Sequence, residues 1–386
     1  MSAVAQAVRQ YVSAYETRPT PAASPSAPPS GPTEPGVDPE AAAQGLEAAL
    51  ELSRQALADG CPQAEFVARL TAALETVTAD GAIARAVLLR LTANLTGTVG
   101  SGRSVQAAPG DDLALVLSQA APGATVHLAA GEYRLDDTLV VLESVTLAGD
   151  DRDTTRLVSG ADEMAVLVMT SGLVGLRDLT LTRDPATSGS GIVTGGASTL
   201  RLKRVTVSGA RAGQDRQGGA GLDLTGSDTA ASPGRTTAEV TDSEFSGNSW
   251  SGISVSGGHR VSIVGSRFAD NGQCGLCFLG SAEGSVETSR FEANGIGVAA
   301  VGTATPLVRE NRVSGGEVGI QVGGAAQPTV DTNRISSAER AAVILTEQAA
   351  GVLRHNVCSE VPVGIALAKT ALPTLLDNEC TLVQAK

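Results

Sequence analysis

The segments that decide the fold are DSEFSGN (242–248), GSRFADN (265–271), TSRFEAN (288–294) and ENRVSGG (310–316), which align without gaps. Three further copies follow at 332–338, 355–361 and 377–383. The second position of each copy holds a Ser or an Asn, namely Ser243, Ser266, Ser289, Asn311, Asn333, Asn356 and Asn378. These residues are 23, 23, 22, 22, 23 and 22 positions apart. A fixed period of this length indicates one structural unit repeated along the chain.

Each repeat contains three short apolar segments. One apolar residue lies three positions before the Ser or Asn, another lies two positions after it, and a Gly-Ile type segment such as GISV (252–255) follows. Three short strands in about 22 residues describe one coil of a parallel β-helix, in which stacked coils share a continuous core. We expect the equivalent Ser and Asn side chains to stack in a turn and to bond one another and the backbone.

The region before these repeats has looser coils of the same kind. Residues 111–151 (DDLALVLSQAAPGATVHLAAGEYRLDDTLVVLESVTLAGDD) resemble the start of pectate-lyase-like right-handed β-helices, and the later coils resemble the Asn-rich repeats of carbohydrate-binding proteins and sugar hydrolases. The resemblance covers residues 104–380. It implies an all-β, right-handed parallel β-helix of about 10–11 coils, with a short helix capping its N-terminal end. It implies no single activity, because this fold hosts lyases, hydrolases, esterases, epimerases and non-enzymes.

Four regions are expected along the chain. Residues 1–17 carry a helical apolar stripe, 18–37 form a Pro/Ser/Ala-rich disordered linker, 38–97 form a small helical module, and 104–386 form the β-helix. Within the module, a third helix is expected to begin after Gly81. The first segment is either a docking helix or a frayed terminus. The few residues after Cys380 leave the last coil with little cover, which predicts self-association or a partner at that end.

Composition limits the partners and the compartment. The net charge of −13 disfavours nucleic acid and anionic membrane. The five cysteines, together with the lack of a signal peptide pattern, predict a cytoplasmic protein with reduced thiols. Cys274 and Cys277 are expected to be too far apart on an extended strand for a disulfide, and Cys358 and Cys380 to be two buried, stacked thiols. Scattered histidines and cysteines predict no metal or cofactor site.

Candidate catalytic residues gather on two long loops. The outward residues of the Gly-Ile strands are expected to be Val193, Asp223, Ser254, Cys277, Gly297, Gln321, Ile344 and Ala366, of which only Asp223 is ionisable. The loops 182–191 and 209–221 should lie side by side next to it. They supply the candidate residues Arg183, Asp184, Arg211, Asp215 and Arg216. These residues could bind an acidic substrate, with calcium in the case of a lyase, or could be solvated and paired with one another.

A second candidate site is a ladder of arginines. Arg267, Arg290, Arg312 and Arg334 follow the Ser or Asn in four successive copies and should stack about 4.8 Å apart. They could bind a polyanion such as an acidic polysaccharide, or they could be neutralised by the nearby acids Glu287, Asp331, Glu310 and Asp242. In the neighbouring ladder, Glu287, Arg309, Asp331 and Arg354 alternate in sign and should pair with one another.

These features predict a non-enzymatic binding or scaffold protein that presents a rigid face to a polymer or a protein partner. The alternative is a lyase, hydrolase or epimerase acting on acidic glycans, with its site near residues 182–223. A third hypothesis gives residues 1–17 a docking role.

Overall fold

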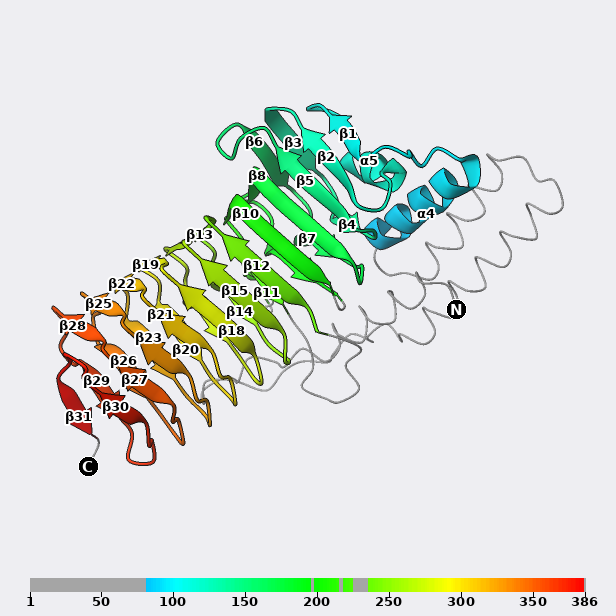
Figure 1. Ribbon diagram of the computed structural model, residues 1–386. Helices are drawn as coiled ribbons and strands as arrows, with labels where there is room; N and C mark the ends of the chain where they lie inside the picture. Colours follow the sequence, from blue (N-terminus) through cyan, green and yellow to red (C-terminus); the bar gives the residue numbers. More distant parts are fainter. Residues whose placement is uncertain (1–80, 196–197, 215–217, 225–234, 385–386) are drawn as a thin grey trace.

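The computed structural model describes residues 81–195, 198–214, 218–224 and 235–384. Their strands pair in parallel into two sheets that wind along a right-handed solenoid, with eleven strands in one sheet and twenty in the other (Figure 1). The predicted right-handed parallel β-helix is therefore confirmed. The expected segment 1–17, the linker 18–37 and most of the module 38–97 lie outside the described residues.

The smaller sheet supplies one strand to each turn of the solenoid. In chain order it contains β4 (Leu139–Val141), β7 (Glu163–Val168), β9 (Gly189–Thr194), β11 (Leu222–Leu224), β14 (Ser251–Val255), β17 (Cys274–Phe278), β20 (Ile296–Ala300), β23 (Val318–Val322), β26 (Ala341–Leu345), β29 (Ile365–Leu367) and β31 (Leu382–Gln384). We call it sheet B.

The larger sheet, sheet A, supplies the rest of each turn. Its strands in the first coils are β1 (Ser104–Ala107), β2 (Ala124–Leu128), β3 (Gly131–Leu135), β5 (Val145–Gly149), β6 (Thr155–Ser159), β8 (Leu173–Arg183) and β10 (Thr199–Ser208). Those in the regular coils are β12 (Thr237–Thr241), β13 (Glu244–Ser246), β15 (Arg260–Val264), β16 (Arg267–Ala269), β18 (Glu283–Glu287), β19 (Arg290–Glu292), β21 (Leu307–Arg309), β22 (Arg312–Ser314), β24 (Thr329–Asp331), β25 (Arg334–Ser336), β27 (Val352–Arg354), β28 (Val357–Ser359) and β30 (Thr374–Leu376).

Among the described residues, two helices lie at the N-terminal end of the solenoid (Figure 1). Helix α4 (Gly81–Thr96) opens the described part of the chain and buries Ile83 and Val87. Helix α5 (Leu113–Gln119) begins at Asp112, whose carboxylate accepts hydrogen bonds from the backbone N–H groups of Ala114 and Leu115. Leu113 and Leu117 belong to the same hydrophobic cluster as the strands, so α5 caps the core as expected.

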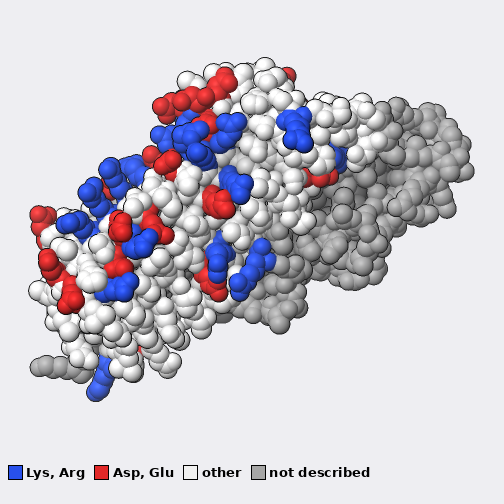
Figure 2. Space-filling view, in the orientation of Figure 1, with Lys and Arg blue, Asp and Glu red and all other residues white. Residues whose placement is uncertain are grey.

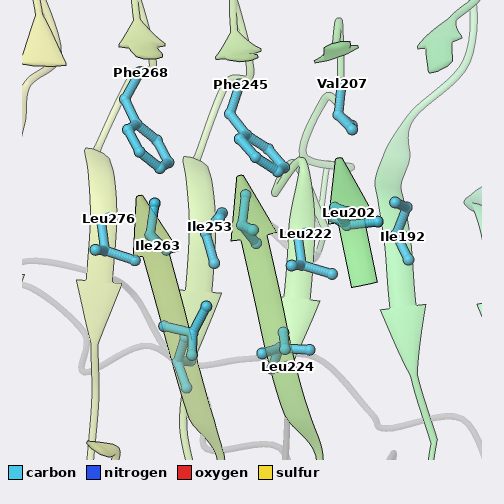
Figure 3. Packing of buried hydrophobic residues seen from close by; sticks show 14 of the residues in the cluster. Ile192, Leu202, Val207, Leu222, Leu224, Phe245, Ile253, Ile263, Phe268 and Leu276 are labelled. Carbon is cyan, nitrogen blue, oxygen red and sulfur yellow. The ribbon is translucent and has the colours of Figure 1, made fainter. Parts of the chain in front are cut away.

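The interior of the solenoid is filled by stacked apolar side chains (Figure 3). Phe245, Phe268 and Phe291 lie on successive coils, with ring centroids 5.5 and 4.7 Å apart and nearly parallel planes. Like residues stack because each coil is paired in register with the next, for example Phe245 with Phe268. The repeat in the sequence is therefore the repeat of the core.

Polar ladders run beside this core. Asn311 donates from Nδ2 to Oδ1 of Asn333 and to the carbonyl of Val286, at 3.0 and 2.9 Å, and Asn333 bonds Asn356 in the same way. The predicted Ser/Asn ladder is confirmed. A second ladder, Asn248, Asn271 and Asn294, occupies the last position of the first three copies, and the sequence analysis missed it.

The cysteines differ from expectation. Cys274 and Cys277 form a disulfide with a Cα–Cα distance of 6.0 Å. Cys274 pairs with Ser251 and Leu276 pairs with Ile253, but Gly275 between them has no partner in the ladder. The strand bends there, so Cys274 and Cys277 are closer than on a straight strand.

The pair Cys358 and Cys380 is stacked on adjacent coils as expected. It is, however, a half-buried disulfide with a Cα–Cα distance of 4.9 Å, rather than two buried thiols. The expectation of reduced thiols is wrong for these four cysteines, and Cys61 lies outside the described residues. Within the described residues, no helix is long and apolar enough to span a membrane.

Candidate functional site

The two long loops lie side by side as the sequence predicts. Gly189 and Arg211 form an antiparallel bridge, and the Arg211 N–H donates to the Gly189 carbonyl at 3.0 Å. Asp215 and Arg216 lie outside the described residues. The arrangement of this candidate site therefore depends on Arg183, Asp184, Arg211 and Asp223.

Arg183 is a structural residue of the first loop. It is 3% exposed, and its guanidinium donates to the backbone carbonyls of Ala161, Ser188 and Ser190. Burial lowers the pKa of Arg183, and the charge of Asp162 partly offsets that effect. Its side chain holds the loop in shape through these carbonyls, and a binding role for Arg183 stays a prediction.

The other loop residues do not converge with Arg183. Asp184 accepts from the backbone N–H of Ala186 at 2.9 Å and lies 3.8 Å from Arg134, while Arg211 is exposed. Asp223 is buried on β11, stacked between Val193 and Ser254 on the outer face of sheet B. The described part of this region holds its polar groups within the loops, so a catalytic role for Asp223 stays a prediction.

The outer column of sheet B differs at one position from the sequence analysis. Cys277 pairs with Ala299, and Ala299 pairs with Gln321, so Ala299 occupies the place expected for Gly297. The segment GIGV (295–298) offers two Gly residues for alignment, and the wrong one was matched. Gly297 and Ala299 are two positions apart and so would point to the same face of a strand. The other outward residues are therefore assigned correctly.

The arginine ladder is formed on sheet A. Arg267 pairs in register with Arg290, Arg290 with Arg312, and Arg312 with Arg334, one on each coil. In the space-filling view, basic side chains follow this edge of the solenoid over β19, β22 and β25 (Figure 2). Their close approach follows from the coil spacing of about 4.8 Å.

Arg267 is neutralised within the ladder. It bonds Glu244 of the preceding coil at 2.9 Å and Glu292 of the following coil at 2.8 Å. Burial lowers the pKa of Arg267, but the hydrogen bond with Glu292 and the two negative charges raise it overall. The expected internal pairing is correct for this arginine.

The other three arginines are exposed and differ from Arg267. Among the described residues, no Asp or Glu oxygen lies within 4.0 Å of the side-chain nitrogens of Arg290, Arg312 or Arg334. We call these three residues the arginine strip. Of the two alternatives for these arginines, pairing with the nearby acids Glu287, Asp331 and Glu310 is not formed among the described residues.

The acids that the sequence offered to the strip are used elsewhere. Glu287 bonds Arg309, and Asp331 bonds Arg354 at 2.9 Å, which confirms the alternating ladder in the neighbouring column. Hydrogen bonds from Arg354, Thr332 and His355 outweigh the effect of burial and lower the pKa of Asp331. Both carboxylates are bound to arginines of the neighbouring column and do not pair with the strip.

Two connected grooves follow the strip, with volumes of about 340 and 540 Å³. Both are lined by Arg290, Arg312 and Arg334. Hydroxyl groups line the two sides: Thr288 and Thr332 on one, and Ser314, Ser336 and Ser359 on the other. Glu310 and Glu292 are the acidic residues in these linings. The grooves therefore offer charged and neutral hydrogen-bond donors to an extended anion.

Metal chemistry has no visible site in the described part of the chain, where no group of three His, Cys, Asp or Glu residues could hold an ion. His355 lies 3.2 Å from Asp331, at the edge of the alternating ladder.

Solved structures similar to this chain include the A-modules of the Azotobacter vinelandii mannuronan C-5 epimerases AlgE6 (15% identity, TM-score 0.45, 80% of this chain and 96% of that chain) and AlgE4 (17%, 0.41, 80% and 94%). The Agl-KA catalytic domain is also similar (11%, 0.38, 68% and 63%). No curated protein matches the sequence. Residues 229–380 match the family described as "Right handed beta helix region", in agreement with the strand pairing of the chain as a right-handed parallel β-helix.

Proposed function

We propose that this β-helix is a non-catalytic binding protein that holds an extended acidic polysaccharide along the arginine strip. The observation that carries the proposal is the stack of Arg290, Arg312 and Arg334 on successive coils without a carboxylate partner among the described residues. Two unit charges about 4.8 Å apart in water repel by about 0.9 kcal/mol. A bound polyanion removes this repulsion.

The shape of the strip favours a linear polymer over a small anion. The three arginines form a straight row along the solenoid axis, one per coil, within two connected grooves. An acidic polysaccharide carries regularly spaced carboxylates or sulfates, which suits a regular row of cations. Its hydroxyls suit the flanking Thr288, Thr332, Ser314 and Ser336. The overall negative charge of the chain disfavours indiscriminate binding of polyanions.

The test is a binding titration of the full chain with polygalacturonate, with a sulfated polysaccharide, and with neutral dextran as the control. We expect binding to both acidic polymers that weakens as salt increases, and none to dextran. Binding to dextran with the same affinity would contradict the role of charge. Equal or tighter binding of single-stranded DNA would contradict the choice of a polysaccharide.

Catalysis is tested in the same samples. The proposal expects both acidic polymers to keep their length and their sugar composition after long incubation with the protein. Turnover that is lost in Asp223→Ala would overturn the non-catalytic assignment and support the enzymatic alternative. Turnover that Asp223→Ala leaves unchanged would also overturn that assignment and would place the chemistry elsewhere.

A further inference from the structure

A second surface, on sheet B, is unrelated to the arginine strip. Its outward side chains on β17 to β29 form two uncharged columns, which we call the apolar face: Cys274, Ile296, Val318 and Ala341 in one, and Cys277, Ala299, Gln321, Ile344 and Ala366 in the other. They form hydrophobic clusters separate from the core of the solenoid. The outside of sheet B is therefore apolar over five successive coils.

Most of the apolar face is buried although it points away from the lumen, and Ile296, Gln321 and Ala366 are half-buried. Val318 and Ala341 are 2% exposed, and Cys277 and Ala299 are 3% and 5% exposed. Side chains on the outer face of a single sheet contact solvent unless a further layer covers them. The described helices α4 and α5 contact β1 and β4, at the far end of the solenoid. Neither described helix therefore covers the apolar face.

We propose that residues 2–17 of the same chain form this cover, as an amphipathic helix laid along the apolar face. The apolar stripe of that segment consists of Val4, Val8, Tyr11, Val12 and Tyr15, at helical spacing. Eleven helical steps from Val4 to Tyr15 extend about 17 Å. The five strands from β17 to β29 extend about 19 Å at the usual strand spacing. The two apolar surfaces therefore match in length.

The chain is long enough to reach this face. Residues 18–37 are a Pro-rich stretch that can extend by about 3.1 Å per residue, or about 60 Å in total. Residues 18–80 join the segment to α4, which begins at Gly81 and contacts β4. The distance along sheet B from β4 to β20 is six strand spacings, or about 29 Å, which is less than the reach of residues 18–37 alone. A tether longer than the span keeps the segment at a high effective concentration, which favours the same chain over a second copy.

Photo-crosslinking tests the cover in the full-length protein. Benzoylphenylalanine in place of Tyr11 should cross-link to residues of β20, β23 and β26, and in place of Gln10, on the opposite side of the segment, it should not. A mixture of ¹⁴N- and ¹⁵N-labelled chains distinguishes cross-links within one chain from cross-links between two chains. We expect cross-links within one chain. Cross-links between chains would replace the proposal with a dimer, and Tyr11 cross-links that avoid these strands would overturn it.

Thiol labelling supplies a second measurement. In an Ala341→Cys background, Val8→Asp should expose the face and increase the labelling rate of the new thiol about tenfold or more, because an open state becomes populated. Gln10→Asp adds the same charge on the polar side of the segment and should leave the rate unchanged. Equal rates in both variants would contradict the proposal. Both measurements are independent of polysaccharide binding, so neither proposal fails with the other.

Discussion

The outer faces of the two sheets differ although the same coils build both. On sheet A, stacking in register produces columns of charge, either alternating as in Glu287, Arg309 and Asp331 or uniform as in the arginine strip. On sheet B, the same stacking produces columns of small apolar residues that are buried. A solenoid repeat multiplies whatever residue occupies an outward position, so each face acquires one chemical character along its length.

The largest expected difference between the faces is in their tolerance of a new carboxylate. Val318→Asp places an unpaired charge in a buried apolar column and should lower the free energy of unfolding by about 3 kcal/mol or more. Ser314→Asp, on the sheet A side of the same coil, should change it by less than about 0.5 kcal/mol. Urea denaturation measures both. Similar losses would show that the apolar face is no more buried than the strip.

The arginine strip can be lengthened by freeing Arg267. Glu244→Gln combined with Glu292→Gln removes both of its partners and should yield four consecutive unpaired arginines. We expect the affinity for an acidic polysaccharide to rise about threefold or more at low salt, since each exposed charge contact contributes up to about 1 kcal/mol. The matched control is Glu317→Gln, which frees Arg340 away from the strip. An equal gain in the control would mean that only net charge matters.

Acid should break the ion pairs of the paired arginines and so make them resemble the unpaired arginines of the strip. A hydrogen bond from Arg260 lowers the pKa of Glu283, and Arg204 does the same for Asp178, so both pairs persist to a pH below the ordinary carboxyl pKa of about 4. Their contribution to stability is present above that value and is lost as the pH falls through the lowered pKa.

A sulfated polymer stays charged in this range and is the suitable probe. As the pH falls below about 4, through these lowered pKa values, Glu283 and Asp178 are neutralised and release Arg260 and Arg204. Both arginines lie outside the strip, so the affinity for the polymer should rise by no more than about twofold. A titration monitored by fluorescence anisotropy of the labelled polymer measures the change. A fall in affinity over this range, with the fold intact by circular dichroism, would be the contrary result.

The smallest expected effect concerns Asp223. It lies on sheet B, away from the strip, so Asp223→Asn should leave the affinity for acidic polysaccharide within about twofold of the original value. A large loss would move the binding site toward the loops 182–191 and 209–221. Calorimetric titration distinguishes the two outcomes.

The repeat made the fold predictable from the sequence. The disulfide and one outward residue could not be predicted, because they depend on local backbone geometry. The period placed Asn311, Asn333 and Phe268 correctly, because each of these positions is fixed by the coil length. The Cys274–Cys277 disulfide was missed because the bend at Gly275 shortens the strand by an amount that spacing alone does not show. Gly295 and Gly297 can both be aligned with the Gly of the repeat. The sequence therefore predicted Gly297 at an outward position that Ala299 occupies.

Ion pairing was harder to predict than stacking. The sequence places several acids near the arginines. Which acid bonds which arginine depends on the direction in which each side chain extends from its coil. Glu292 reaches back to Arg267, whereas Glu287 bonds Arg309 of the next coil. The unpaired state of Arg290, Arg312 and Arg334 therefore emerged only from the three-dimensional structure.

The most direct test of the account compares two triple variants of equal charge in polysaccharide binding. Arg290→Gln/Arg312→Gln/Arg334→Gln removes the strip, and Arg260→Gln/Arg309→Gln/Arg340→Gln removes three arginines that are paired with Glu283, Glu287 and Glu317. We expect the first variant to lose about 10- to 100-fold in affinity for polygalacturonate at low salt, and the second to lose about threefold or less. Equal losses in the two variants would contradict it.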